Sequence, residues 1–166
     1  MGSYHRFYDF RIDGDVAGYF ELAVSPEEIY QCASFTTGDT IEVNEYMLRI
    51  EDAELVAFST GEQPGWTSLG RYSDDAYPLS AFPYLIDRLE DERTYDPIIE
   101  STGAVVARRT LRREGETVLE YQDGRVMRSF TLAEGIPIEI DWGGATSSIR
   151  ESQEDALRTS PVGYHR

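Results

Sequence analysis

Apolar and polar residues alternate with a period of two along most of this 166-residue chain, and turn-forming residues interrupt the alternation at short intervals. An alternation of this period places successive side chains on opposite faces of a β-strand. The strongest interruption is Asp123-Gly124, a pair that tolerates the positive φ angles of a tight hairpin. The sequence therefore predicts an antiparallel meander in which consecutive strands pair with each other.

The predicted strands form two blocks. The first block covers residues 4–12, 16–24, 29–36, 40–50 and 53–59, and the second covers 104–112, 117–122, 125–132, 136–142 and 146–150. We expect a mainly β fold with a minor α contribution, in which the meander forms a barrel or half-barrel with one short helix. The length suits one domain over residues 1–150, and residues 151–166 are predicted to be a polar C-terminal tail.

The segment between the blocks, residues 61–97, is rich in Gly, Pro, Tyr and Asp, and it contains the predicted helix. Apolar residues recur there at helical spacing from Phe82 to Leu89. Ser80 is the predicted N-cap, and Pro83 falls in the first turn, where its missing N–H is harmless. The charged residues 87–93 are expected to be the solvated end of this helix.

The chain contains no lysine: its 15 cationic side chains are all arginine, against 31 Asp and Glu, for a formal net charge of −16. This excludes Schiff-base chemistry, pyridoxal phosphate as a cofactor and the phosphate-binding lysine of a Walker loop. The negative charge repels phosphate backbones, so no nucleic-acid partner is expected. The composition fits a halophile, in which salt screens the repulsion, and it also fits a GC-rich genome.

Catalytic and metal sites have no recognisable motif in the sequence. His5 and His165 lie at opposite ends of the chain, and neither shares a motif with Cys32 or with a serine. The spacing of zinc and calcium ligands is absent, so we expect no metal, no cofactor and no identifiable catalytic residue. One cysteine cannot form an internal disulfide, and no stretch reads as a signal peptide or a membrane span. We therefore expect a cytoplasmic protein, of undetermined oligomeric state, without an integral membrane segment.

Two arginines stand on strand faces that are otherwise apolar. Arg109 and Arg128 both alternate in phase with apolar neighbours, so both are predicted to point inward. An inward guanidinium needs an acceptor, and the carboxylate or phosphate headgroup of a ligand is one. The alternatives are a buried pair with Glu120 or Glu139, or an arginine whose head reaches the rim of the fold.

Aromatic residues are concentrated around the predicted helix. They can roof a ligand cavity, or they can fill one end of a barrel as ordinary core. A further aromatic residue precedes a glycine-assisted turn at residues 142–148, where a bulge or turn is favoured over an anion-binding loop. The predicted ligand-binding aromatic residues are Trp66, Tyr77, Phe82, Tyr84 and Trp142.

The order of these elements carries a resemblance to a known group of folds. A β meander is followed by the element YPLSAFPYLI at residues 77–86 and by a second meander that ends IPIEIDW at 136–142. This layout, over about residues 4–150, resembles the lipoprotein-carrier-like (LolA-type) half-barrels and the related putative glycolipid-binding half-barrels. The resemblance implies a curved antiparallel sheet around a hydrophobic cavity, with helical segments across its mouth.

These observations predict a non-enzymatic protein that binds a hydrophobic or amphipathic, lipid-like small molecule in the cavity of a β half-barrel. One alternative is a protein–protein interaction module with a fully packed sheet. A second alternative is a hydrolase or isomerase based on carboxylates. It requires two carboxylates about 5 to 10 Å apart in the pocket, at least one with a raised pKa.

Overall fold

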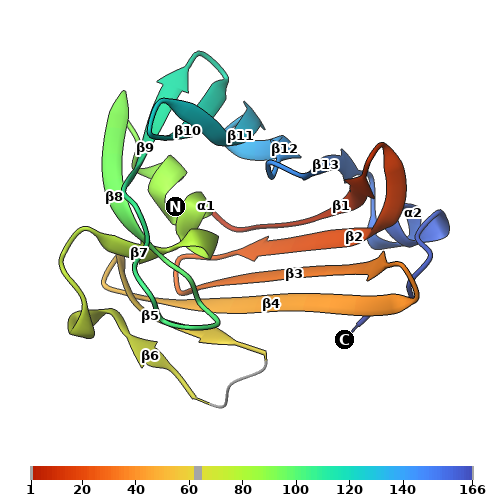
Figure 1. The fold of residues 1–166 in the computed structure, drawn as a ribbon, viewed down its shortest axis with the longest axis horizontal. Helices are drawn as coiled ribbons and strands as arrows, with labels where there is room; N and C mark the ends of the chain where they lie inside the picture. The colour runs from red at the N-terminus through yellow and green to blue at the C-terminus, as the bar shows by residue number, and fades with distance from the viewer. Residues whose placement is uncertain (1, 62–64, 166) are drawn as a thin grey trace.

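The computed structural model describes residues 2–61 and 65–165, and these residues build a single curved sheet. The strand order is β6-β5-β4-β3-β2-β1-β13-β12-β11-β10-β9-β8-β7, and all neighbours are antiparallel except the short pair β7 and β8. The sheet curls around a concave face without closing on itself (Figure 1). The mainly β fold, predicted as a barrel or half-barrel, is confirmed, and it takes the open form.

The first five strands follow the predicted boundaries within one residue, and a short sixth strand, Thr67–Ser68, was not predicted. The long strands of this first block are joined by tight turns, such as the one in which Asp13 and Gly14 take φ angles of 52° and 84°. Residues 62–64, between the last two strands, lie outside the described residues. The strands are β1 (Tyr4–Ile12), β2 (Asp15–Val24), β3 (Glu28–Thr37), β4 (Thr40–Glu51), β5 (Glu54–Thr60) and β6 (Thr67–Ser68).

The second block contains one strand that the sequence did not reveal. Residues 92–98 form a strand, although the charge run before them was expected to be a helix end. Their neighbour begins at Arg109 and not at residue 104, so Val105 is 50% exposed. The strands are β8 (Glu92–Ile98), β9 (Arg109–Glu114), β10 (Thr117–Gln122), β11 (Arg125–Ala133), β12 (Ile136–Asp141) and β13 (Ala145–Arg150).

The two blocks join where the first strand meets the last one. β1 pairs antiparallel with β13, with Tyr8 opposite Ile149, so the N-terminal strand lies in the middle of the sheet. This pairing gives both blocks one continuous concave face. The main core lies on that face and is built from Tyr8, Phe20, Leu22, Ile29, Leu48, Leu111 and Phe130, among others.

The connecting segment fills one end of the concave face. β7 (Ala76–Pro78) leads into the 3-10 turn η2 (Leu79–Ala81) and then into α1 (Phe82–Asp87), while a further 3-10 turn, η1 (Leu69–Arg71), precedes them. The predicted helix is confirmed, with Pro83 in its first turn. Ser80 is not its N-cap, because α1 begins after Ala81 without a side-chain cap. Ser80 lies inside η2, with its own backbone N–H bonded elsewhere.

The C-terminal segment is not an exposed tail along its whole length. Ser152 caps the helix α2 (Gln153–Arg158) by accepting a hydrogen bond from the backbone N–H of Asp155. Ala156 and Val162 are buried against Phe7 and Tyr19, on the face of β1 and β2 opposite the main core. Two buried apolar residues among polar ones are too few to produce a periodic signal, so the sequence did not show this docking.

None of the helices in the described parts of the chain is both long enough and apolar enough to cross a membrane.

Candidate functional site

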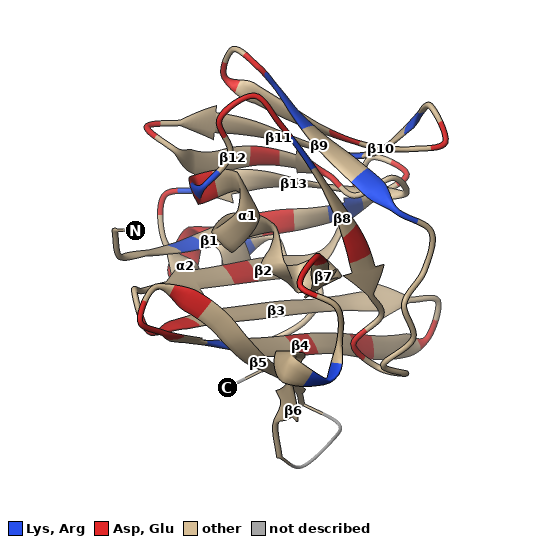
Figure 2. Cartoon of the chain, turned by 90° about the vertical axis from the view of Figure 1, so that its left-hand side faces the viewer, with Lys and Arg blue, Asp and Glu red and all other residues tan. Residues whose placement is uncertain are grey.

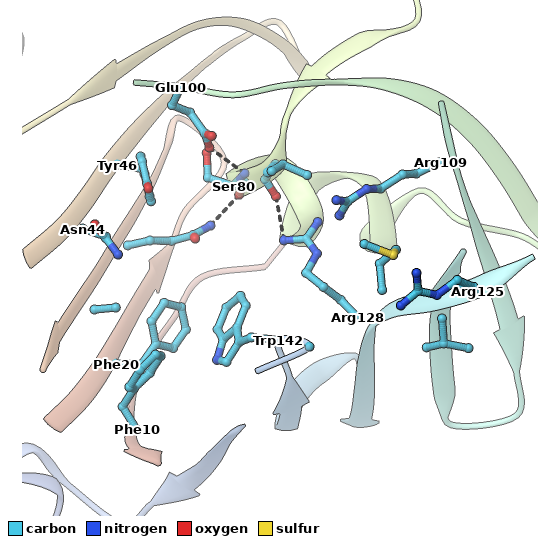
Figure 3. A pocket seen from close by; sticks show the side chains of 16 residues that line it. Phe10, Phe20, Asn44, Tyr46, Ser80, Glu100, Arg109, Arg125, Arg128 and Trp142 are labelled. Carbon is cyan, nitrogen blue, oxygen red and sulfur yellow. Dashed lines mark hydrogen bonds between the residues drawn. The ribbon is translucent and has the colours of Figure 1, made fainter. Parts of the chain in front are cut away.

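A cavity of about 460 Å³ opens on the concave face, between the strands of the two blocks. One wall comes from β1 to β4, the other from the start of β11 and the turn after β12, and η2 closes one end (Figure 3). The lining residues are Phe10, Phe20, Gln31, Ala33, Asn44, Tyr46, Leu79, Ser80, Glu100, Arg109, Arg125, Val126, Met127, Arg128, Trp142 and Gly143.

Aromatic side chains form the apolar part of the wall. The ring of Phe20 meets Trp142 edge-on, with 5.0 Å between the centroids, and Phe10 stacks on Phe35 at 4.6 Å. The indole Nε1 of Trp142 donates to Ser147 Oγ over 3.0 Å, which fixes the orientation of the ring. Trp142 therefore offers the cavity an apolar ring while its polar atom is satisfied inside the protein.

Polar groups from three separate elements meet at the end closed by η2. Glu100 is only 6% exposed, and one of its carboxylate oxygens accepts the backbone N–H of Ser80 over 2.8 Å. Gln31 on β3 donates to the backbone carbonyl of Ser80. The buried hydroxyl Oγ of Ser80 has no hydrogen-bond partner among the residues that the structure describes.

The opposite wall is built on a buried group of charges. Glu120 on β10 faces Arg128 on β11, and two hydrogen bonds of 2.7 and 2.9 Å join them. Arg109 on β9 donates to the same carboxylate over 2.8 Å, and the hydroxyl of Tyr95 donates to it over 2.6 Å. The two inward arginines predicted from the sequence are thus both inward, and both are partnered by Glu120 and not by Glu139.

The pKa of Glu120 reflects this environment. Burial acts to raise the pKa of its carboxyl group, but the charge of Arg128 and the hydrogen bonds from Arg128, Tyr95 and Arg109 outweigh burial and lower the pKa to about 2. For Arg128, burial acts to lower the pKa, and the charge of Glu120 outweighs it and raises the pKa. The ion pair is therefore fully charged at neutral pH.

Arg125, at the start of β11, differs from the other two arginines. It lines the cavity from an exposed position. Its guanidinium makes no hydrogen bond or ion pair with any residue in the ranges 2–61 and 65–165. Figure 3 shows Arg109, Arg125 and Arg128 together on the side of the cavity opposite Phe10 and Phe20.

The structure brings three of the seven predicted site residues to the cavity: Arg109, Arg128 and Trp142. The other four, which are all aromatic, lie elsewhere because the connecting segment packs as core and surface. Phe82 is buried and stacks on Phe130 at 4.8 Å. Tyr84 lies under Arg88, whose guanidinium carbon is 3.7 Å from the ring centroid.

Tyr77 and Trp66 are also absent from the cavity lining. Tyr77 packs against Tyr84, and Arg93 donates to its hydroxyl over 3.0 Å. Trp66 is 38% exposed, and the guanidinium carbon of Arg49 lies 4.1 Å from its ring centroid. The sequence left two alternatives for the aromatic residues of the connecting segment, which were to cover a ligand cavity or to pack within the protein. The structure favours the second alternative for these four residues.

Several lining residues were missed by sequence reasoning. Gln31 shares a strand face with Ile29, and Asn44 shares one with Leu48, so inward polar positions were visible in the alternation. The criterion that identified Arg109 identifies both of these residues as well. Glu100 lies in a loop without periodicity, and only the tertiary structure places it at the cavity.

The remaining reactive side chains lie away from the cavity. His5 contacts the buried carboxylate of Glu21 at 2.6 Å, on the opposite face of the sheet. Cys32 is buried on that same face. Within the described residues, no three His, Cys, Asp or Glu side chains come together in a group that could hold a metal ion.

No protein-family model matches the sequence, and no curated protein matches it. Among solved structures, the chain is similar to a DUF1089 family protein from Pseudomonas aeruginosa. The identity is 12%, the match covers 87% of this chain and 90% of that chain, and the TM-score is 0.48.

Proposed function

We propose that this protein binds a hydrophobic or amphipathic small molecule, without acting on it chemically. The observation that carries the proposal is the cavity of about 460 Å³, which joins an aromatic wall to a wall of arginines. Sites for small molecules enclose roughly 300 to 1,000 Å³, are mostly apolar and contain a few polar groups that fix orientation. Phe10, Phe20 and Trp142 suit the apolar body of such a ligand.

The cavity distinguishes this proposal from an interaction module with a packed sheet. In an interaction module that binds its partner through a surface site, side chains fill the concave face of the sheet. In this protein the concave face is filled in that way around Phe82 and Phe130. The cavity lies beyond this packed region. Ala33 and Asn44 line it, and larger apolar side chains at these two residues would fill the cavity.

The carboxylates do not favour acid–base catalysis. A general acid in the pocket needs a pKa raised toward neutrality. Glu120 has its pKa lowered to about 2 by Arg128 despite burial, so it stays ionised and serves the ion pair. Within the described residues, Glu100 is the one carboxylate that lines the cavity, whereas a carboxylate-pair mechanism requires two.

The proposal also includes the cellular location of the protein, which we infer from its composition. We place the protein in the cytoplasm, because its single cysteine, Cys32, cannot form an internal disulfide of the kind that is typical of proteins in oxidising compartments. A high-salt cytoplasm would screen the formal charge of −16.

Fluorescence titration of delipidated protein tests the proposal. A Trp66→Phe background leaves Trp142, at the cavity, as the single indole. We expect saturable quenching by an amphipathic probe such as dodecanoate, and we expect mass spectrometry of gently purified protein to detect a retained small molecule. Failure of fatty-acid, isoprenoid and glycolipid probes to bind saturably would falsify the proposal.

A cavity-filling variant provides the matched control. Ala33→Phe places a ring in the cavity from its wall and should abolish saturable binding while the protein remains folded. Ile41→Phe makes the same kind of change at a residue of β4 that is 61% exposed and does not line the cavity. It should leave binding unchanged.

A further inference from the structure

We infer that the ligand is a singly charged anion, an amphipathic monocarboxylate, and that Arg125 and Arg109 hold its head while Arg128 does not. This inference rests on the proposed function. It assigns the charge and the contacts of the ligand that the cavity binds.

The first step is the uneven distribution of positive charge. The chain carries a formal net charge of −16, yet the cavity lining contains three arginines, Arg109, Arg125 and Arg128, and one carboxylate, Glu100. Figure 2 shows Arg segments on and around β9, whereas Asp and Glu are spread over most of the elements. The cavity wall is therefore a cationic region of an acidic protein, and such a region concentrates anions.

The second step is the hydrogen bonding of Arg128. Its Nε and Nη2 donate to the two oxygens of Glu120, and Nη1 donates to the backbone carbonyl of Leu79 over 3.0 Å. Nη2 also lies 3.4 Å from the hydroxyl of Tyr95. All three nitrogens are thus engaged by the protein, so Arg128 fixes η2 and β10 in place and has little capacity left for a ligand.

The other two arginines keep donors for a ligand. Arg109 uses Nε on Gln122 and Nη1 on Glu120, and Nη2 has no bond within the described residues. Arg125 has no polar partner there through any of its nitrogens. Both side chains extend from the arginine wall toward the interior of the cavity in Figure 3.

The third step is the formal charge of the site. Arg109, Arg125 and Arg128 face two glutamates, Glu120 and Glu100, which leaves one positive charge uncompensated. One anionic group neutralises it, whereas a phosphate monoester, with a charge of about −1.5 to −2 at pH 7, exceeds it. Planar guanidinium groups match the two oxygens of a carboxylate. The aromatic wall then receives the apolar body.

Four probes with a common tail test the assignment. Dodecanoate, dodecanol, dodecyl phosphate and dodecyltrimethylammonium, each below its critical micelle concentration, are titrated into delipidated Trp66→Phe protein. An octyl series is measured in parallel. We expect dodecanoate to bind at least about tenfold more tightly than dodecanol, because it alone neutralises the site. The ammonium probe should bind most weakly.

The arginine assignment is tested in the same titration. Arg125→Gln should weaken dodecanoate about tenfold and leave dodecanol unchanged, because only the head contact is lost. Arg71→Gln removes an exposed arginine outside the cavity and serves as the matched control for overall charge. It should change neither affinity.

The outcomes separate this inference from the proposed function. Equal binding of dodecanol and dodecanoate overturns the anionic head but supports the cavity as a ligand site. Tighter binding of dodecyl phosphate than dodecanoate overturns the single charge. An unchanged dodecanoate affinity in Arg125→Gln overturns the role of Arg125. Absence of saturable binding by every probe counts against the proposed function itself.

Discussion

Glu120 and Arg128 stand directly opposite each other on β10 and β11 and form a two-point ion pair inside the protein, with N–O distances of 2.7 and 2.9 Å. Arg109 joins the same carboxylate, and Tyr95 completes its hydrogen bonding. An ion pair removed from water is retained at low cost only when its remaining donors and acceptors are satisfied, and this one meets that condition. The group connects β8, β9, β10 and β11 beneath the cavity.

Glu120→Gln should destabilise the fold by about 3 to 5 kcal/mol, because it leaves Arg128 charged, buried and without its counter-ion. Urea denaturation followed by circular dichroism measures the change. Glu116→Gln removes a carboxylate at an exposed position near β10 and should stay within about 0.5 kcal/mol of the unmodified protein. Similar unfolding midpoints for the two variants would show that the pair does not hold the strands together.

The same pair predicts a loss of stability in acid. The pKa of Glu120 falls from a usual 4.5 to about 2 in the folded protein, since Arg128 outweighs the effect of burial. The stability that it contributes is therefore fully present above about pH 4.5 and is lost as the pH falls toward 2. The free energy of unfolding should decline more steeply over this window in the unmodified protein than in Glu120→Gln. Parallel curves would contradict the assignment.

The alternation in sequence was sufficient to predict most of the sheet. Period two located ten strands, β1 to β5 and β9 to β13, because apolar residues alternate along them and most of the turns between them contain residues with positive φ. It failed at β8, where ERTYDPI mixes charges into the pattern and contains a proline. β8 is a strand because β9 pairs with it, and this tertiary contact overrides a weak local signal.

The site was less predictable than the fold. Arg109 and Arg128 were identified because an inward charge breaks the alternation, and Trp142 because it adjoins a glycine turn. Arg109 and Arg128 share Glu120 as their partner because of the register in which the strands pair. Alternation alone does not determine this register, since a bulge interrupts the pairing between Glu120 and Tyr121. Glu100 could not be predicted, since a loop residue has no face.

Gly18→Ala should destabilise the protein by about 1 to 3 kcal/mol through overpacking. A Cβ at this residue would lie 1.8 Å from the carbonyl oxygen of Ser34 and 2.6 Å from Cα of Phe35, so the backbone of β3 would have to move. Gly144→Ala adds a Cβ with no atom within 4 Å and is the matched control. Thermal unfolding compares the two, and equal melting temperatures would contradict the close approach of β2 and β3.

Cys32 should resist alkylation in the folded protein. Burial raises the pKa of its thiol to about 11, and the thiolate is the reactive form. Iodoacetamide at pH 8 should add one carbamidomethyl group, detected by mass, only after denaturation. Rapid modification under native conditions would show that the face of β3 under the C-terminal segment is open to solvent.

The docking of the C-terminal segment depends in part on one hydroxyl. Tyr164 donates to both oxygens of Glu21 at 3.0 and 3.1 Å, and Glu21 is fully buried and also contacts His5. Tyr164→Phe keeps the ring against Phe7 but removes the donor, and it should cost about 1 to 3 kcal/mol, because a buried carboxylate loses a hydrogen bond.

Hydrogen exchange identifies where that loss acts. Amides of α2 and of the residues that follow it should exchange faster in Tyr164→Phe than in the unmodified protein. Amides of β10 and β11 should exchange at an unchanged rate, because these strands are held together by the ion pair of Glu120 and Arg128. Tyr121→Phe removes a hydroxyl that makes no hydrogen bond within residues 2–61 and 65–165, and it should leave both regions unchanged. Unaltered exchange of α2 in Tyr164→Phe would mean that the hydrogen bond between Tyr164 and Glu21 does not help to hold the segment on the sheet.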